Sequence, residues 1–409
     1  MIAPHGSYRT SAFVAAASRL GVEVLIASEG RHSIVSHYAR GLHLDLSDEE
    51  ASLQQILDEG ASRPFGGIVG TDDSTTGLAA RAAAILGLPH NPPEAVRLGW
   101  RKDLARNCLR QAGLPVPRYR CLDLRRPLAP QIADLVYPLV VKPVALSGSR
   151  GVIRVDNEMA LQQAVARIVA IIQGEARLPA EVAQTLLLEA FIPGEEVAVE
   201  GMLQAGRLQI LSVFDKPDPL DGPFFEETYY TTPSRHPPAV LAEVERVVQA
   251  ACTAYGLREG PVHAECRLNG EGVWILEVAA RTIGGLCGRL LRFGTGYTLE
   301  ELVLAQAMGQ PLPMTARRDA AGVLMIPIPQ AGILKRVEGL LEAQRVEYIE
   351  SVEIQIREGH ELVPLPEGAS YLGFMFARAP SAAEAEAALR RAHACLNIIV
   401  APLWKISVA

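Results

Sequence analysis

Lysine is scarce in this chain of 409 residues, where it supplies only five of the 39 basic side chains. Acidic side chains outnumber basic ones by 46 to 39, so the net charge is −7. A protein that holds nucleic acid through its phosphates is more often basic, and we therefore expect no nucleic-acid partner. Because arginine dominates so strongly, a retained lysine is a candidate for a position where arginine cannot replace a compact ammonium group. The five are Lys102, Lys142, Lys216, Lys335 and Lys405.

Long hydrophobic runs and targeting signals are also missing. No apolar run reaches about 18 residues, the length that crosses a membrane. The first residues show no basic region followed by an apolar stretch, which argues against a signal peptide. The six cysteines form no C-x-x-C pair and no zinc-type cluster with histidine, so they read as buried thiols in a reducing compartment. We expect a soluble, cytoplasmic protein without a membrane partner.

Three motifs of common enzyme classes are absent as well. No Gly-x-Gly-x-x-Gly follows the first expected strand, so a dinucleotide site there is weakly supported. No Walker loop leads into a helix, and no Gly-x-Ser-x-Gly motif supplies a serine nucleophile. Any catalysis is therefore expected to proceed without a covalent enzyme intermediate.

Helix and strand signals alternate in the first part of the chain and change character further on. The alternation predicts a parallel, doubly wound α/β domain over residues 1–93, with 89–93 as a linker. Hairpin signals and longer helices predict a second domain over 94–310, which ends where Gly309, Pro311 and Pro313 mark a further boundary. The remainder, 311–409, reads as a small α+β lobe. The expected helices are 11–20, 48–57, 75–86, 101–112, 158–172, 239–255, 298–308 and 382–394. The expected strands are 1–4, 22–27, 67–70, 137–143, 185–191, 196–203, 208–214, 261–268, 273–279, 352–356 and 371–377.

A strand-borne lysine followed by a glycine-rich turn is the first feature that suggests chemistry. The ammonium of Lys142 can neutralise phosphate charge, and the bare amides of the turn can approach phosphate oxygens closely. An ordinary hairpin turn is the alternative. The turn consists of Ser147, Gly148, Ser149, Arg150, Gly151 and Val152.

An extended apolar segment ending in acidic residues is the second feature. Glu189, Ala190, Phe191 and Ile192 can present backbone groups to an adenine edge, and Glu196 can bind ribose hydroxyls. By itself the segment is better explained as an acidic turn between strands.

Two glutamates on facing strands are the third feature, and an arginine beyond them is the fourth. Glu265 and Glu277 lie in apolar strands, where unpaired carboxylates are costly, so their convergence suggests a Mg²⁺ site. A pair of solvated glutamates is the alternative. Arg281, followed by Gly284 and Gly285, can hold a carboxylate close to the backbone; a surface salt bridge is the commoner fate of an arginine.

Taken in order, these features resemble the ATP-grasp superfamily over about residues 90–310, and the preceding residues resemble its N-terminal domain. Val278–Arg281 and the C-terminal lobe are most similar to carboxylate–amine ligases of the L-amino-acid (dipeptide) ligase type. The resemblance implies that Lys102, Lys142 and Lys216 contact ATP phosphates. It implies a lid subdomain over about residues 115–190, a mobile lid over the triphosphate at residues 147–152, adenine at 189–192 and ribose at Glu196.

The resemblance also implies metal ligation by Glu265 and Glu277, with one or two Mg²⁺ ions or Mn²⁺ in their place. Arg281 would stabilise an acyl phosphate. Many ATP-grasp enzymes carry a further ligand, asparagine, two residues after the second glutamate; here that residue is Ala279. Similar amino-acid ligases also have a small residue there, although the change leaves room for a catalytically weak or inactive relative.

The function that follows is an ATP-dependent ligase that joins a small-molecule carboxylate to an amine, with amino acids as the expected substrates. Two alternatives are a ligase or carboxylase acting on a nucleotide precursor or amino sugar, and a nucleotide-binding regulatory protein without turnover. No general base is evident, although Glu200 and Glu226 are candidates. A homodimer is the expected assembly, since superfamily members are often dimers.

Overall fold

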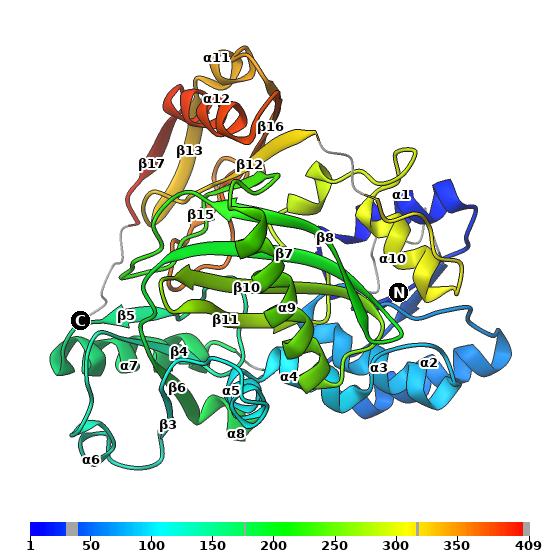
Figure 1. Ribbon diagram of the computed structural model, residues 1–409, viewed down its shortest axis with the longest axis horizontal. Coiled ribbons are helices and arrows are strands. Elements are labelled where there is room, and N and C mark those ends of the chain that lie inside the picture. The colour runs from blue at the N-terminus through cyan, green and yellow to red at the C-terminus, as the bar shows by residue number, and fades with distance from the viewer. Residues whose placement is uncertain (30–39, 176, 316–318, 404–409) are drawn as a thin grey trace.

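The computed structural model describes residues 1–29, 40–175, 177–315 and 319–403. A large mixed α/β arrangement has one long sheet in its middle and three groups of elements around it (Figure 1). In the view of Figure 1 the N-terminal elements lie to the right, a small sheet to the lower left and the C-terminal elements at the top. Lys405 lies outside the described residues.

The N-terminal part contains the parallel pairing expected from its sequence. Strands β1 and β2 pair in parallel, and Ile2 bridges in parallel to both Ala27 and Gly70. The strands expected at 1–4 and 67–70 are thus reduced to single bridges. Helix α3 starts at a capping box on Asp72 and ends at Gly87, whose φ of 68° is readily adopted by glycine. The elements are α1 (Thr10–Leu20), β1 (Leu25–Ser28), β2 (Arg40–His43), α2 (Glu49–Ser62) and α3 (Asp73–Leu86).

Two short helices connect this part to the rest of the chain. They are α4 (Pro93–Trp100) and α5 (Lys102–Gln111). The expectation of a linker over 89–93 was wrong at its last residue, because Pro93 is the first residue of α4. Proline is favoured there, since the first turn of a helix leaves its N–H groups without intrahelical partners.

A four-stranded antiparallel sheet forms the region expected as a lid. Its strands are ordered β3-β6-β4-β5, and α7 covers one face with Leu161, Val165 and Ile168. The position of Lys142 on β4 follows from the run of apolar residues before it, which is buried throughout. The elements are β3 (Tyr119–Asp123), α6 (Ala129–Ile132), β4 (Leu139–Pro143), β5 (Ile153–Val155), α7 (Glu158–Gln173), α8 (Ala180–Ala183) and β6 (Thr185–Ala190).

The long central sheet has eight strands in the order β11-β10-β7-β8-β9-β12-β16-β14. Helix α9 packs through Val244 and Val248 on one face of the strands β11, β10, β7 and β8. Helix α10 and the 3-10 turn η2 pack on the opposite face of the sheet. The first-half elements are β7 (Glu195–Gln204), β8 (Arg207–Lys216), β9 (Tyr229–Thr232), α9 (Pro238–Tyr255), β10 (Gly260–Asn269), β11 (Gly272–Ala279), η2 (Cys287–Leu290) and α10 (Leu299–Ala307).

The C-terminal segment shares this sheet. β12, β16 and β14 extend it from β9, because β12 pairs with β9 over Ala321–Leu324. A separate three-stranded sheet, β15-β13-β17, and two helices complete the α+β lobe at the top of Figure 1. The elements are β12 (Ala320–Ile326), β13 (Gly332–Glu338), α11 (Leu340–Gln344), β14 (Ile349–Ile354), β15 (Glu361–Leu362), β16 (Gly373–Ala379), α12 (Ala382–Ala394) and β17 (Asn397–Ala401). The domain boundaries themselves stay predictions.

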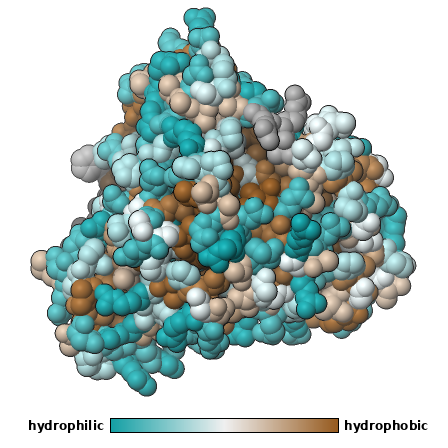
Figure 2. All heavy atoms as spheres, in the orientation of Figure 1, coloured by the Kyte–Doolittle hydropathy of each residue, from teal (hydrophilic) through white to brown (hydrophobic). Residues whose placement is uncertain are grey.

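Hydrophilic side chains cover much of the face seen in Figure 2, and hydrophobic ones gather near its middle, over the central sheet. No helix among the described residues combines the length and apolar character needed to cross a bilayer.

Candidate functional site

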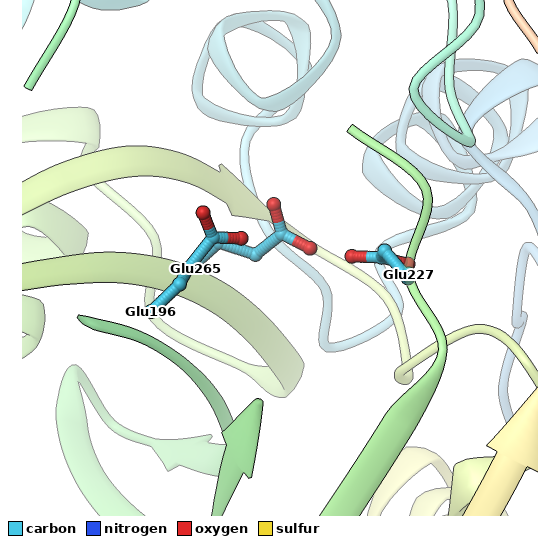
Figure 3. Close-up of side chains that lie close together, drawn as sticks. All are labelled: Glu196, Glu227 and Glu265. Carbon is cyan, nitrogen blue, oxygen red and sulfur yellow. The ribbon is translucent and has the colours of Figure 1, made fainter. Parts of the chain in front are cut away.

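A buried lysine surrounded by three carboxylates marks one end of the site. The Lys216 ammonium lies 2.7 Å from Glu196 Oε1, 2.7 Å from Glu227 Oε1 and 3.1 Å from Glu265 Oε1. Strand pairing explains part of this arrangement, since Glu196 on β7 is the direct partner of Lys216 on β8. In Figure 3 the carboxyl groups of Glu196 and Glu265 lie side by side, and Glu227 faces them from the segment before β9.

The three carboxylates of this cluster determine the pKa of Lys216. Burial alone would lower the pKa of Lys216, but the three carboxylates outweigh it and hold the pKa well above its ordinary value. Tyr230 donates a hydrogen bond to Glu227 Oε1 at 2.6 Å, which fixes that carboxylate. Oxygen atoms of Glu196, Glu227 and Glu265 all lie within 4.8 Å of one another, so the group offers the hard oxygen ligands that Mg²⁺ prefers.

Glu227 was not among the residues chosen from the sequence as metal ligands. Its signal was the aromatic and acidic run Phe224–Tyr230, which reads equally as a surface loop. Glu226 was chosen instead as a candidate base. Burial raises the pKa of Glu226, but it lies outside the carboxylate group that surrounds Lys216.

The facing glutamates expected on two strands are directly opposite each other. Glu265 on β10 is the cross-strand partner of Glu277 on β11. The two carboxylates nevertheless contact different lysines, because Lys102 Nζ lies 3.3 Å from Glu277 Oε2 while Lys216 binds Glu265. Lys102 also donates to the carbonyl of Leu146 at 2.7 Å, which joins the start of α5 to the loop after β4.

Lys142 forms a second buried ionic group with Glu189 and Arg106. Its ammonium lies 2.5 Å from Glu189 Oε2, and Arg106 Nε bonds the other carboxylate oxygen. Burial would raise the pKa of Glu189, but the charges of Arg106 and Lys142 outweigh it and lower the pKa to about 2. Burial lowers the pKa of Lys142, and Glu189 opposes that shift. The side chain of Glu189 is thus committed to these two cations.

The segment after Glu189 is held mainly by arginine. Arg267 donates to the carbonyl of Ile192 at 2.9 Å and pairs with Glu196 at 3.1 Å. Its guanidinium also lies 5.0 Å from the ring centre of Phe191, which Arg154 faces at 4.4 Å. The chain between Glu189 and Glu196 therefore has a fixed course, which the sequence alone did not reveal.

The glycine-rich turn after Lys142 adopts left-handed backbone at three positions. The φ angles are 65° at Gly148, 54° at Ser149 and 70° at Gly151. Gly151 N–H donates to the carbonyl of Pro366 at 2.9 Å, and Arg150 donates to the carbonyl of Glu367 at 2.7 Å. The turn therefore rests on the C-terminal segment, a contact between residues more than two hundred positions apart.

Arg281 is buried, which differs from the surface salt bridge considered as its alternative. Its Nε donates to Asp73 Oδ1 at 2.7 Å, and burial, which would lower the pKa, is outweighed by Asp73, so the pKa is raised. Gly285 has φ of 59° and a Cβ there would lie 2.3 Å from the sulfur of Met325. A Cβ on Gly284 would meet only ordinary contacts, 3.5 Å from the hydroxyl of Tyr8.

Three family models match successive parts of the chain. A model described as "ATP-grasp domain" matches residues 135–289, "ATP-grasp N-terminal domain" matches 14–90, and "L-amino acid ligase C-terminal domain 2" matches 324–401. A D-alanine–D-alanine ligase from Desulforudis audaxviator is 32% identical over 54% of this chain and 69% of its own length. The chain belongs to the ATP-grasp family.

Two further similar proteins are named as an L-amino acid ligase and a carnosine synthase. The crystal structure of an L-amino acid ligase from Bacillus licheniformis matches with a TM-score of 0.82 and 28% identity, covering 98% of both chains. Carnosine synthase 1 from Homo sapiens is 27% identical over 74% of this chain, which spans only 39% of that protein. The expected three-part ATP-grasp fold is thereby confirmed.

The ATP-grasp position that departs from the common pattern faces a buried histidine. Ala279 is the cross-strand partner of His263. His263 lies between two carboxylates, with Nδ1 3.7 Å from Glu200 and Nε2 3.6 Å from Glu265. Burial would lower the pKa of His263, but Glu200 and Glu265 outweigh it and raise the pKa to about 9. Glu200 also accepts the Ile283 N–H at 3.0 Å, so it joins the carboxylate cluster to the segment after Arg281.

Substitution of Glu227 tests its part in cation binding. We expect Glu227→Gln to raise the Mg²⁺ concentration for half-maximal ATP turnover by about 10–100-fold, because the carboxylate oxygens are the donors and their neighbours orient them. The measurement is a Mg²⁺ titration of ADP formation. Glu226→Gln is the matched control and should leave the half-saturating concentration unchanged. Equal Mg²⁺ curves for both variants would remove Glu227 from the metal site.

Proposed function

We propose that this ATP-grasp protein is an ADP-forming carbon–nitrogen ligase that joins the carboxylate of one amino acid to the amine of another. The observation that carries the proposal is the convergence of Lys102, Lys142 and Lys216 with a set of carboxylates beside the buried Arg281. The likeness to an L-amino acid ligase over nearly the whole of both chains supports the amino-acid substrates.

The lysines neutralise the triphosphate in this proposal. Lys142 and Lys102 contact phosphate oxygens, and Lys216 is a further contact that exchanges part of its bonding to carboxylates for phosphate. Such point charges suit phosphate oxygens, whereas a planar guanidinium requires paired acceptors. The 147–152 turn closes over the phosphates and excludes water, which would otherwise hydrolyse an activated acyl group.

The nucleoside is assigned to the segment from Ala190 to Glu196. Because the carboxylate of Glu189 is bonded to Lys142 and Arg106, the adenine edge is recognised by backbone groups of Ala190–Ile192. The remaining acceptor capacity of Glu196 serves the ribose hydroxyls, beside its bonds to Lys216 and Arg267.

Magnesium is the metal that the donor set fits. Glu265 and Glu277 face each other across two strands, and Glu227 and Glu196 add oxygen donors beside Glu265. A bound Mg²⁺ would neutralise charge on the phosphate oxygens and help to position the reacting groups. Mn²⁺, which also accepts oxygen ligands, is the expected substitute.

The chain's own groups orient the acceptor carboxylate. Arg281 is positioned by Asp73 and stabilises the negative charge on the carboxylate oxygens and on the oxyanion of the tetrahedral species, and the backbone beyond it at Gly284–Gly285 lets the substrate approach closely. A carboxylate is a poor acyl donor, and phosphorylation by ATP makes it a good one. Attack by an amine then forms the amide and releases phosphate, so positioning and charge neutralisation are the main contributions of the protein.

Incubation with ATP, Mg²⁺ and pairs of amino acids tests the proposal. We expect phosphate release that depends on particular pairs, with the amide product seen by mass spectrometry. Glu277→Gln should lower that rate at least about 10²-fold, because a fixed charge partner of the phosphate site is lost. Glu271→Gln, in the exposed turn of the same hairpin, is the control and should retain activity.

Nucleotide binding without release of phosphate for any pair would overturn the ligase proposal. A homodimer in the cytoplasm stays the expected assembly and location. Light scattering of the purified protein measures the first directly.

A further inference from the structure

A pocket of about 510 Å³ lies outside the phosphate site. Residues of α1, of the segment around η2, of the start of α10 and of β14 line it. None of the lysines or metal-site carboxylates described above contributes to its wall. Its volume is within the range of sites that hold small molecules.

The inner wall of this pocket is the segment that follows Arg281. Thr282 and Ile283 line the pocket, and the Arg9 guanidinium is directed at their carbonyl groups at 3.5 and 3.4 Å. Ile283 N–H bonds Glu200 on the other side of the segment. A ligand in the pocket would therefore touch the same stretch of chain that carries the catalytic arginine.

Arg292 gives the pocket a positive charge with no acidic partner among the residues that the structure describes. Its Nη1 donates to the carbonyls of Arg289 and Leu291, at 3.0 and 2.7 Å. These bonds orient the guanidinium and leave its other N–H groups for a ligand. The other three pocket arginines are neutralised, since Arg9 pairs with Asp72, Arg19 with Glu301 and Arg289 with Glu353.

Glu300 supplies the opposite charge. It lies in the first turn of α10 and lines the same pocket, and no ion pair or hydrogen bond of its carboxylate occurs within the described ranges. The wall of the same pocket also contains apolar side chains, including Ala12, Leu286 and Leu299.

We propose that this pocket is a second ligand site, which binds a free α-amino acid or a short peptide. The carboxylate meets Arg292, the ammonium meets Glu300, and the apolar wall receives the side chain. Bidentate pairing of guanidinium with carboxylate gives both strength and orientation to such a site. Binding there requires neither ATP nor turnover, so the inference goes beyond the proposed ligase activity.

Calorimetric titration of the full chain without nucleotide tests the site. The probes are the standard amino acids one at a time and the dipeptide Ala-Ala. For a probe that binds, we expect Arg292→Gln and Glu300→Gln each to raise Kd about tenfold or more, which is about 1.4 kcal/mol. Ala15→Trp, on the exposed face of α1 and in the pocket wall, should abolish binding by filling the space. Arg246→Gln, an exposed arginine on α9, is the matched control and should bind like the unaltered protein.

The probe that binds identifies the source of the ligand. Binding of an amino acid that Ala15→Trp abolishes indicates an effector site for amino acids, and binding of the dipeptide that Ala15→Trp abolishes indicates an effector site for product. Either result supports the site. No binding by any probe, or binding that Ala15→Trp and Arg292→Gln leave unchanged, overturns it. If the unaltered protein binds a probe in this pocket but shows no ligase activity with any pair of amino acids, only the proposed function is contradicted.

Discussion

Replacement of Lys142 by arginine is expected to lower the rate of ATP turnover by about 10²–10³-fold, the usual cost of losing one preorganised charge at a reacting group. Charge is conserved in this substitution, and geometry is not. Lys142 and Arg106 each bind one carboxylate oxygen of Glu189. An arginine at position 142 would need more space and two acceptor oxygens, but Arg106 already occupies one of the two that Glu189 offers. The measurement is ADP formation at saturating ATP and amino acids.

Lys335→Arg is the control for that experiment, because Lys335 is exposed on β13 and has no role in the site. We expect its turnover to equal that of the unaltered protein. Thermal unfolding of both variants separates a folding defect from a catalytic one. Comparable activity of the two arginine variants would remove Lys142 from the phosphate site.

Replacement of Glu189 by glutamine is expected to cost about 3–5 kcal/mol of unfolding free energy near neutral pH, because Lys142 and Arg106 would both stay buried without their carboxylate. Urea denaturation measures the loss. Glu243→Gln is the matched control: that carboxylate pairs with Arg246 on the surface, and such a pair contributes about 0–1 kcal/mol.

The pH dependence of the same variant provides a second readout. The pKa of Glu189 in the folded protein, about 2, lies below its unfolded value of 4.5, so its stabilising contribution is present above pH 4.5. That contribution decreases as the pH falls from 4.5 towards about 2. The difference in stability between the protein and Glu189→Gln should therefore shrink over that range. A difference that is small at neutral pH, or constant as the pH falls, would contradict a buried ion pair at this position.

The sequence predicted most helices and the strand pair that bears Glu265 and Glu277. Local patterns were sufficient there: glycines and prolines mark the ends of α3 and α9, and a short turn joins β10 to β11, which fixes their register. Lys142 was also predicted as a site residue from its strand and the glycine-rich turn after it, and Lys102 from the resemblance to the ATP-grasp superfamily; their role in ATP binding stays a prediction.

The remaining parts of the site depend on contacts between distant segments. Glu227 reaches Lys216 because the chain after β8 returns as β9 along the same sheet, and nothing local in the sequence determines that return. Arg106 lies on α5, and only the packing of that helix brings it to Glu189 on β6. The extension of the central sheet by β12, β16 and β14 is likewise a pairing of distant strands.

The contact between the 147–152 turn and the C-terminal segment has a thermodynamic consequence. Gly151 and Arg150 bond the carbonyls of Pro366 and Glu367, and Arg167 pairs with the carboxylate of Glu367. If closure of the turn both encloses nucleotide and forms these bonds, the two equilibria are linked. If these bonds to the C-terminal segment become stronger, the affinity for nucleotide increases by the same factor, and the release of ADP becomes slower. Exchange of this C-terminal segment between related proteins would thus change the turnover rate, although none of its residues contacts the reacting groups.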